Sequence, residues 1–107
     1  PEERTKEATL YCVVLVNKIT QKRECIKIGI TIGKGWQAAI KRARGFPFHE
    51  IRIQKTVTGN LEDIFYLEDY LHEKWAHKRY HFPEKFGGHS ELFELDDDII
   101  KSIPKSL

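Results

Sequence analysis

The sequence predicts an α/β (α+β) fold, in which a small, largely antiparallel sheet is flanked by helices. Short apolar or alternating stretches with the length of strands recur along the chain, and two stretches with helical periodicity lie among them. Their order is strand, strand, helix, strand, helix, strand, which is typical of this class. The chain has 107 residues, of which 40% are hydrophobic and 32% are charged, so we expect one domain over residues 1–107 with one modest core.

The first two strands are predicted to pair as a hairpin. Residues 10–16 read LYCVVLV, a β-branched and almost wholly apolar run that is typical of a strand covered on both faces. Residues 25–31 read CIKIGIT, whose alternation predicts the return strand, and the polar turn NKITQKRE lies between them. Pairing would make Cys12 and Cys25 candidate neighbours. Neither has a CxxC partner, so we expect two reduced, buried thiols and no structural zinc site.

A helix and a third strand are predicted to follow. Residues 36–44 read WQAAIKRAR and are rich in helix formers, and we expect Trp36 to lie in the core. The glycine and proline of GFP, at residues 45–47, end this helix. Residues 50–57 read EIRIQKTV, and their alternation predicts the third strand.

The longest predicted helix covers residues 61–80, which read LEDIFYLEDYLHEKWAHKRY. Asn60 precedes it as the expected N-cap, because a side-chain oxygen there can accept a hydrogen bond from a free amide of the first turn. After a loop, residues 91–95 read ELFEL and predict a short last strand. Residues 96–107 read DDDIIKSIPKSL, and we expect an exposed acidic tail with a single helical turn. The core would thus extend over about residues 9–95.

An acidic residue interrupts the apolar side of this long helix. At about 100° per residue, Glu68 falls near the centre of the arc that carries Leu67 and Leu71. A buried carboxylate is costly unless something compensates it. Three interpretations remain open: an ion pair with an Arg or Lys of another element, a position at the mouth of a cleft, or a rotated helix that exposes the residue. A carboxylate on a rigid helix near basic groups is suited to a divalent metal.

The distribution of charge says more about partners than the net charge of +2 does. Basic residues gather at 18–23, 41–44 and 77–79, and acidic residues gather near the two ends. Such patches suit a phosphate backbone, although ordinary solvated lysines would read the same way. There is no apolar run of about 18 residues and the chain begins with polar residues. We therefore expect no membrane contact and a cytoplasmic protein (or a nuclear one, if eukaryotic) that is not secreted.

Several of these segments together resemble the GIY-YIG nuclease superfamily. KIGIT, at residues 27–31 on the second strand of a hairpin, resembles the second signature, and LYCVVLV takes the place of the first. LEDYLHEKW, at residues 67–75, looks like the helix that carries the family's glutamate. GHSELFEL, at residues 88–95, is similar to the closing segment of a phage-associated branch that often has KIG in place of YIG. The resemblance covers about residues 9–95 in the right order.

This resemblance implies a three-stranded antiparallel sheet with flanking helices, here with a short extra C-terminal strand. It also implies a DNA endonuclease that hydrolyses phosphodiester bonds with one divalent metal, Mg²⁺ or Mn²⁺. Glu68 matches the metal-binding glutamate, which would explain a carboxylate within the apolar arc. Gly29 matches the signature glycine, which lets backbone approach backbone, and Lys27 sits at the second-signature tyrosine. A lysine there would orient the attacking water or contact phosphate.

Two further family residues are displaced in this sequence. Val13 occupies the expected register of the first-signature tyrosine, and Tyr11, two residues earlier on the same strand face, is our candidate. The expected turn of the first helix holds Gln37 in place of the family's arginine, and Arg42 lies more than a turn later. The resemblance would give Tyr11 a role in preparing the water and Arg42 a role in stabilising the phosphate. If neither residue reaches the cleft, we do not expect hydrolysis.

The remaining candidates are weaker. Lys34, Lys41 and Arg44 are candidates for nonspecific DNA contacts. His72, His89 and Glu91 are possible additional site residues, against the alternatives of a packing histidine and of a residue that caps the last strand. We expect Tyr66 and Tyr70 on the surface.

Three functions compete at this point. The first is the endonuclease domain, with a separate DNA-recognition domain or a homodimer supplying specificity. The second is a catalytically inactive module of the same fold that binds nucleic acid through its basic clusters. The third is a protein-interaction domain in which Glu68 forms a plain buried ion pair.

Overall fold

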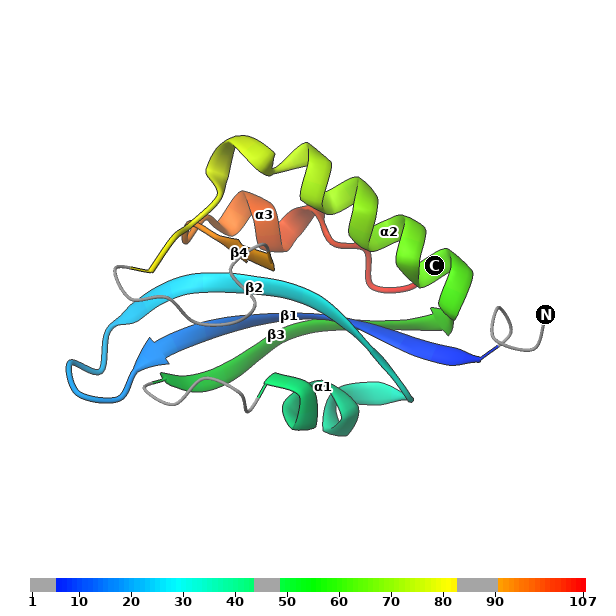
Figure 1. Cartoon of the computed structure of the whole chain (residues 1–107), viewed down its shortest axis with the longest axis horizontal. Helices are drawn as coiled ribbons and strands as arrows, with labels where there is room; N and C mark the ends of the chain where they lie inside the picture. The colour runs from blue at the N-terminus through cyan, green and yellow to red at the C-terminus, as the bar shows by residue number, and fades with distance from the viewer. Residues whose placement is uncertain (1–5, 44–48, 83–90) are drawn as a thin grey trace.

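A four-stranded antiparallel sheet in the order β3-β1-β2-β4 forms the middle of the molecule (Figure 1). The computed structural model describes residues 6–43, 49–82 and 91–107, with residues 38, 39, 42 and 43 described by their backbone alone. The strands are β1 (Glu7–Asn17), β2 (Arg23–Ile32), β3 (His49–Asn60) and β4 (Leu92–Phe93). The predicted fold class is therefore confirmed, with the short last strand as the fourth member of the sheet.

Strand β1 is buried on both faces because it lies between β2 and β3 and is covered from two sides. Its even-numbered residues from Ala8 to Val16 join one apolar cluster, and Tyr11, Val13 and Leu15 join another. This alternation between the two faces explains why the strand reads as a continuous apolar run.

Helices cover the two faces unequally. The structure contains α1 (Gly35–Ala43), α2 (Leu61–Lys74), the 3₁₀ turn η2 (Ala76–Lys78) and α3 (Asp97–Ser102). Helices α2 and α3 lie together on one side of the sheet, and α1 lies on the other (Figure 1). Asn60 caps α2 as predicted, since its Oδ1 accepts a hydrogen bond from Asp63 N at 2.9 Å.

Helix α2 is shorter than predicted, and the C-terminal tail is not exposed. The helix ends at Lys74, and the chain then turns so that Arg79 pairs with Phe93. The prediction of an exposed tail was wrong, because Ile99 of α3 and Ile103 at its C-cap are buried in the same cluster as residues of α2. The core therefore extends past residue 95.

The thiols lie on opposite faces of the sheet and are not neighbours. Cys12 pairs across from Ile28, whereas Cys25 pairs with Leu15 and joins the other cluster. Both are free and buried, as predicted, and burial raises the pKa of each thiol to about 12. Among residues 6–43, 49–82 and 91–107, no helix has the length and apolar composition of a membrane span.

Candidate functional site

Tyr11, Lys27 and Gly29 meet on the face of the sheet that α1 covers. The hairpin register pairs Tyr11 with Gly29 and Val13 with Lys27, so the side chains of these positions share one face. The Tyr11 side chain is fully buried, and a β-carbon added to Gly29 would lie 2.6 Å from its hydroxyl oxygen. The glycine thus admits the phenol ring of Tyr11, where the sequence predicted a close backbone contact.

Lys27 forms a largely buried ion pair with Glu91. Its Nζ lies 3.3 Å from Glu91 Oε2 and 5.7 Å from the centre of the Tyr11 ring, and Lys27 is only 5% exposed. The pairing of Leu92 with Lys27 in the sheet brings Glu91, the residue before β4, to this position. A buried ammonium group needs such a partner, because the desolvation of an unpaired charge is costly.

Glu68 reaches the same region from α2. The residue is half-buried, and within the described part of the chain its Oε2 is buried and accepts no hydrogen bond. The pKa of Glu68 is raised to about 7, first by burial and then by the carboxylates of Glu91 and Asp69, while Lys27 lowers it. The structure therefore rejects the exposed position and shows no ion pair of Glu68 among these residues.

The open edge of β2 explains how a helix on one face brings Glu68 near residues of the other. Strand β4 pairs with Ile26 and Lys27 of β2, and within residues 6–43, 49–82 and 91–107 no strand pairs with Ile28 on this side. His72 Nε2 bonds to the carbonyl of Ile28 at 2.9 Å, and its ring lies 5.3 Å from the ring of Phe93. Glu68 precedes His72 by one turn and so faces the same edge.

The structure therefore brings together five of the predicted site residues: Tyr11, Lys27, Gly29, Glu68 and Glu91. Lys34 and Lys41 are exposed beside and on α1. Arg42 lies in α1, but its side chain is outside the described residues, as are Arg44 and His89. Their roles remain predictions. Tyr66 and Tyr70 are exposed, as predicted.

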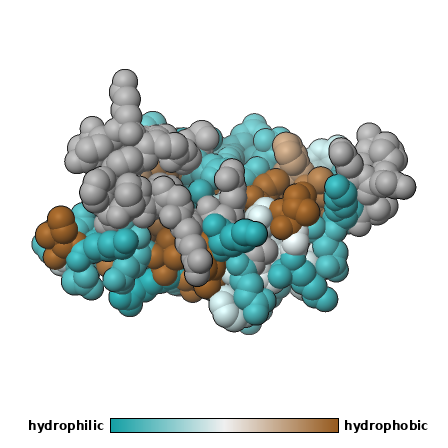
Figure 2. Space-filling view, turned by 60° about the horizontal axis from the view of Figure 1, so that its bottom comes forward, coloured by the Kyte–Doolittle hydropathy of each residue, from teal (hydrophilic) through white to brown (hydrophobic). Residues whose placement is uncertain are grey.

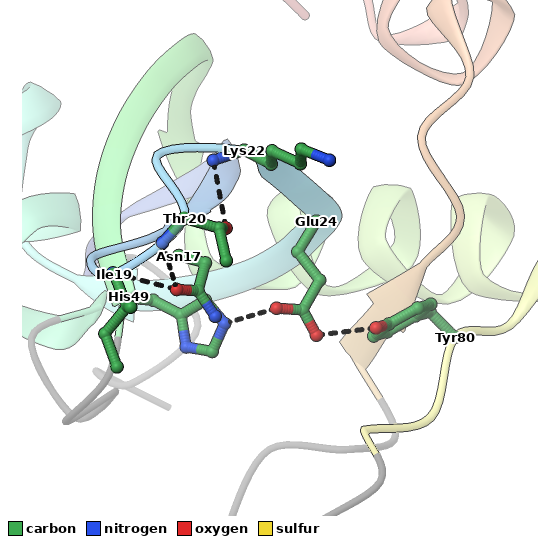
Figure 3. A network of polar contacts seen from close by, with 7 residues as sticks. All are labelled: Asn17, Ile19, Thr20, Lys22, Glu24, His49 and Tyr80. Carbon is green, nitrogen blue, oxygen red and sulfur yellow. Dashed lines mark hydrogen bonds and ion pairs between the residues drawn. The ribbon is translucent and has the colours of Figure 1, made fainter.

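A second polar cluster, which the sequence did not indicate, lies at the opposite end of the hairpin (Figure 3). His49 Nε2 lies 2.7 Å from Glu24 Oε1, and the Tyr80 hydroxyl donates to Glu24 Oε2. Burial alone would raise the pKa of Glu24, but hydrogen bonds from Tyr80, His49 and Asn17 outweigh it and lower the pKa. The cluster joins β2, β3 and the segment after η2. Its members are 25 and 56 residues from Glu24, so no local pattern could have revealed it.

Comparison with known proteins identifies the family of this chain. The search of curated proteins found no match, and neither did the search of solved structures. The T5orf172 domain matches residues 9–107, which takes in β1 from Thr9 onward and the other strands and helices of the described residues. This domain is found in GIY-YIG-related, nuclease-like proteins. The chain belongs to the T5orf172 domain family.

Proposed function

We propose that this chain is a metal-dependent DNA endonuclease domain of GIY-YIG type. One observation carries the proposal: a carboxylate oxygen of Glu68 is buried without a hydrogen bond beside the buried pair of Lys27 and Glu91, within the described residues. A carboxyl group in such a place raises the free energy of the fold when it is ionised, unless a cation compensates it. Strongly perturbed ionisable groups gather at functional sites more often than elsewhere.

The residues present fit a divalent ion that prefers oxygen ligands better than one that prefers nitrogen or sulfur ligands. Glu68 and Glu91 supply carboxylate oxygens, which are the ligands that hard divalent cations prefer. Among the described residues, no group of three or more His, Cys, Asp or Glu side chains could hold a metal ion. Mg²⁺ commonly uses one or two carboxylates together with waters and substrate phosphates, so a sparse site of this kind suits it. Mn²⁺ accepts similar oxygen ligands.

The chain's own residues have distinct tasks in this proposal. Glu68 holds Mg²⁺ or Mn²⁺, which when bound offsets phosphate charge and activates a water. Lys27 is held by Glu91 and presents an ammonium group that donates to the phosphate or to the attacking water. Tyr11 packs beneath this group and limits its movement, because its ring is buried and its hydroxyl abuts Gly29. Arg42, on α1, would stabilise the phosphate charge.

DNA is the proposed partner, and Lys34, Lys41 and Arg44 are proposed to contact its phosphates. Each contact would steepen the decrease of affinity with salt. A domain of this size has little surface for base recognition, so we propose that a separate recognition domain or a homodimer supplies specificity.

An inactive DNA-binding module is the second candidate, and one observation favours it. Tyr11 is fully enclosed and Lys27 is 5% exposed, so the tyrosine presents no surface to a substrate and the lysine presents little. In that case the basic groups near α1 would still bind DNA, and no strand would be cut.

Incubation of the domain with supercoiled plasmid and Mg²⁺ or Mn²⁺ tests the two functions. We expect nicked or linear product from the wild type and a loss of at least about a hundredfold in rate for Glu68→Gln, since removal of one key electrostatic group typically costs this much. Glu73→Gln is the matched control, because it removes an exposed carboxylate from the same helix. Cleavage that survives Glu68→Gln would reject the assigned role. DNA binding without cleavage by the wild type would favour the inactive module.

A further inference from the structure

Trp36 is the most conspicuous residue that the proposed chemistry does not use. The sequence predicted it in the core, but the structure leaves 55% of it exposed at the start of α1. Tryptophan has a large apolar surface, and leaving much of it in water forfeits stabilisation that burial would bring. The exposed indole therefore has an aromatic surface that is available to a ligand.

The backbone that carries Trp36 is held firmly in place. Thr9, fully buried in β1, donates from its Oγ1 to Gly33 O at 2.8 Å and accepts from Gly35 N at 3.0 Å. Gly33 N in turn donates to Glu7 O at 3.0 Å. Both glycines have positive φ, at 117° and 81°, so the turn suits glycine at these two positions. A surface fixed before binding loses less entropy when a ligand arrives.

The charges around Trp36 select the kind of ligand. Lys34, two residues before Trp36, is exposed, and Lys41 is exposed further along α1. Figure 2 shows the molecule turned so that the side of α1 comes forward. On α2, the exposed Phe65 and Tyr66 share the helix with the exposed acidic Glu62 and Asp69, whereas Tyr70 has Lys74 Nζ over its ring at 5.7 Å. An aromatic side chain beside basic groups is the combination that binds single-stranded nucleic acid, through stacking and phosphate contacts.

Trp36 follows the strand that carries two residues of the candidate site. Strand β2 carries Lys27 and Gly29 and leads directly into the turn that starts at Gly33. Gly29 and Gly33 are four residues apart, which is about 13 Å at roughly 3.3 Å per residue. That distance corresponds to about four nucleotides of a stacked strand at roughly 3.4 Å each.

We propose that Trp36 stacks on an unpaired base of the DNA strand whose phosphate enters the site, so that the substrate contains unpaired nucleotides within a few positions of the cut. The proposal rests on the proposed function for the location of the cut. The stacking itself does not depend on cleavage and can be measured without it.

The test is binding by fluorescence anisotropy in EDTA, with three labelled DNA hairpins. One has a fully paired stem, one has a gap of four unpaired thymidines in the stem, and one has four abasic spacers in that gap. We expect the thymidine gap to bind about tenfold more tightly than the other two, because stacking on one aromatic side chain contributes this much or more. Trp36→Leu should remove the preference and Trp36→Phe should keep part of it. Tyr66→Leu, an exposed aromatic on α2, should leave it unchanged.

Equal affinity of the wild type for the three hairpins would overturn the proposal, and so would a preference that persists in Trp36→Leu. The cleavage assay separates this result from the proposed function. A base-dependent preference in a protein that never cuts DNA would support stacking and reject hydrolysis. Cleavage of fully paired DNA at equal rates by the wild type and Trp36→Leu would support hydrolysis and reject stacking.

Discussion

Replacement of Glu68 by glutamine should stabilise this protein at neutral and alkaline pH. The folded state raises the pKa of Glu68 from its ordinary value of 4.5 to about 7. The folded state therefore keeps this proton up to a higher pH than the unfolded chain does. As a result, the free energy of unfolding falls as pH rises from about 4.5 to about 7 and stays lowered above that range. Glutamine carries no charge at any pH and removes this penalty.

The magnitude follows from the two pKa values. The interval from 4.5 to about 7 corresponds to about 3.4 kcal/mol at roughly 1.36 kcal/mol per pH unit. Because the side chain is only half-buried, solvent screens part of this energy, and we expect about 1–2 kcal/mol. For a domain of this size, each kcal/mol changes Tm by about 4–8 °C. Glu68→Gln should therefore raise Tm by about 5–10 °C at pH 8.

Thermal unfolding in EDTA at pH 4.5 and pH 8 is the assay. Glu68→Gln should gain stability over the wild type at pH 8 and little at pH 4.5. Glu73→Gln, which removes an exposed carboxylate from the same helix, should behave alike at both pH values. A Glu68→Gln protein that loses stability at pH 8 relative to the wild type would refute the reasoning, because it would mean that another group of the protein stabilises the carboxylate.

Three other substitutions test the packing and charges around the site. Gly29→Ala should lower the free energy of unfolding in urea by about 1–3 kcal/mol, since the new methyl group meets the buried Tyr11 hydroxyl. Gly59→Ala should lower it less, because its methyl group meets the exposed side chain of Leu107. Equal losses would contradict the contact between Gly29 and Tyr11. Glu91→Gln should leave the Lys27 ammonium without its carboxylate, at about 2–3 kcal/mol, and should lower the pKa of Glu68 in carboxyl ¹³C NMR; an unchanged pKa would show that the two carboxylates do not interact. Ile103→Ala should lower the free energy of unfolding by about 2–4 kcal/mol, because the side chain is buried. A change near zero would mean that the tail is exposed after all.

The strands and the start of α2 could be predicted because local sequence determines them. Alternation in residues 25–31 and the amide of Asn60 act within a few residues, and both predictions hold. The tail could not be placed in the same way. Ile99 lies on a six-residue helix and Ile103 at its C-cap, and a helix this short depends on tertiary contacts and gives little periodicity to read. The prediction that Trp36 lies in the core was wrong for a related reason: a helical pattern does not show which aromatic residue stays exposed to water.

The sequence predicted several residues of the candidate site but not the contacts between them. An acidic residue within an apolar arc identified Glu68, and the KIG segment identified Lys27 and Gly29. The ion pair of Lys27 with Glu91 depends on which strand joins the edge of β2, and that pairing spans 64 residues. The hydrogen bond between the Glu24 carboxylate and His49 likewise depends on how the sheet is assembled, and no local sequence pattern predicts it.

The most direct test of the site is a pH titration of Glu68 by carboxyl ¹³C NMR, without divalent ions, with Mg²⁺, and with Mg²⁺ plus a short DNA duplex. We expect a pKa near 7 in the absence of metal. Because binding a cation favours the ionised form, Mg²⁺ at about ten times its dissociation constant should lower this pKa by about one pH unit, more readily when DNA is present. A Glu68 that titrates near 4.5 without metal, or a raised pKa that neither Mg²⁺ nor Mg²⁺ with DNA changes, would contradict the account.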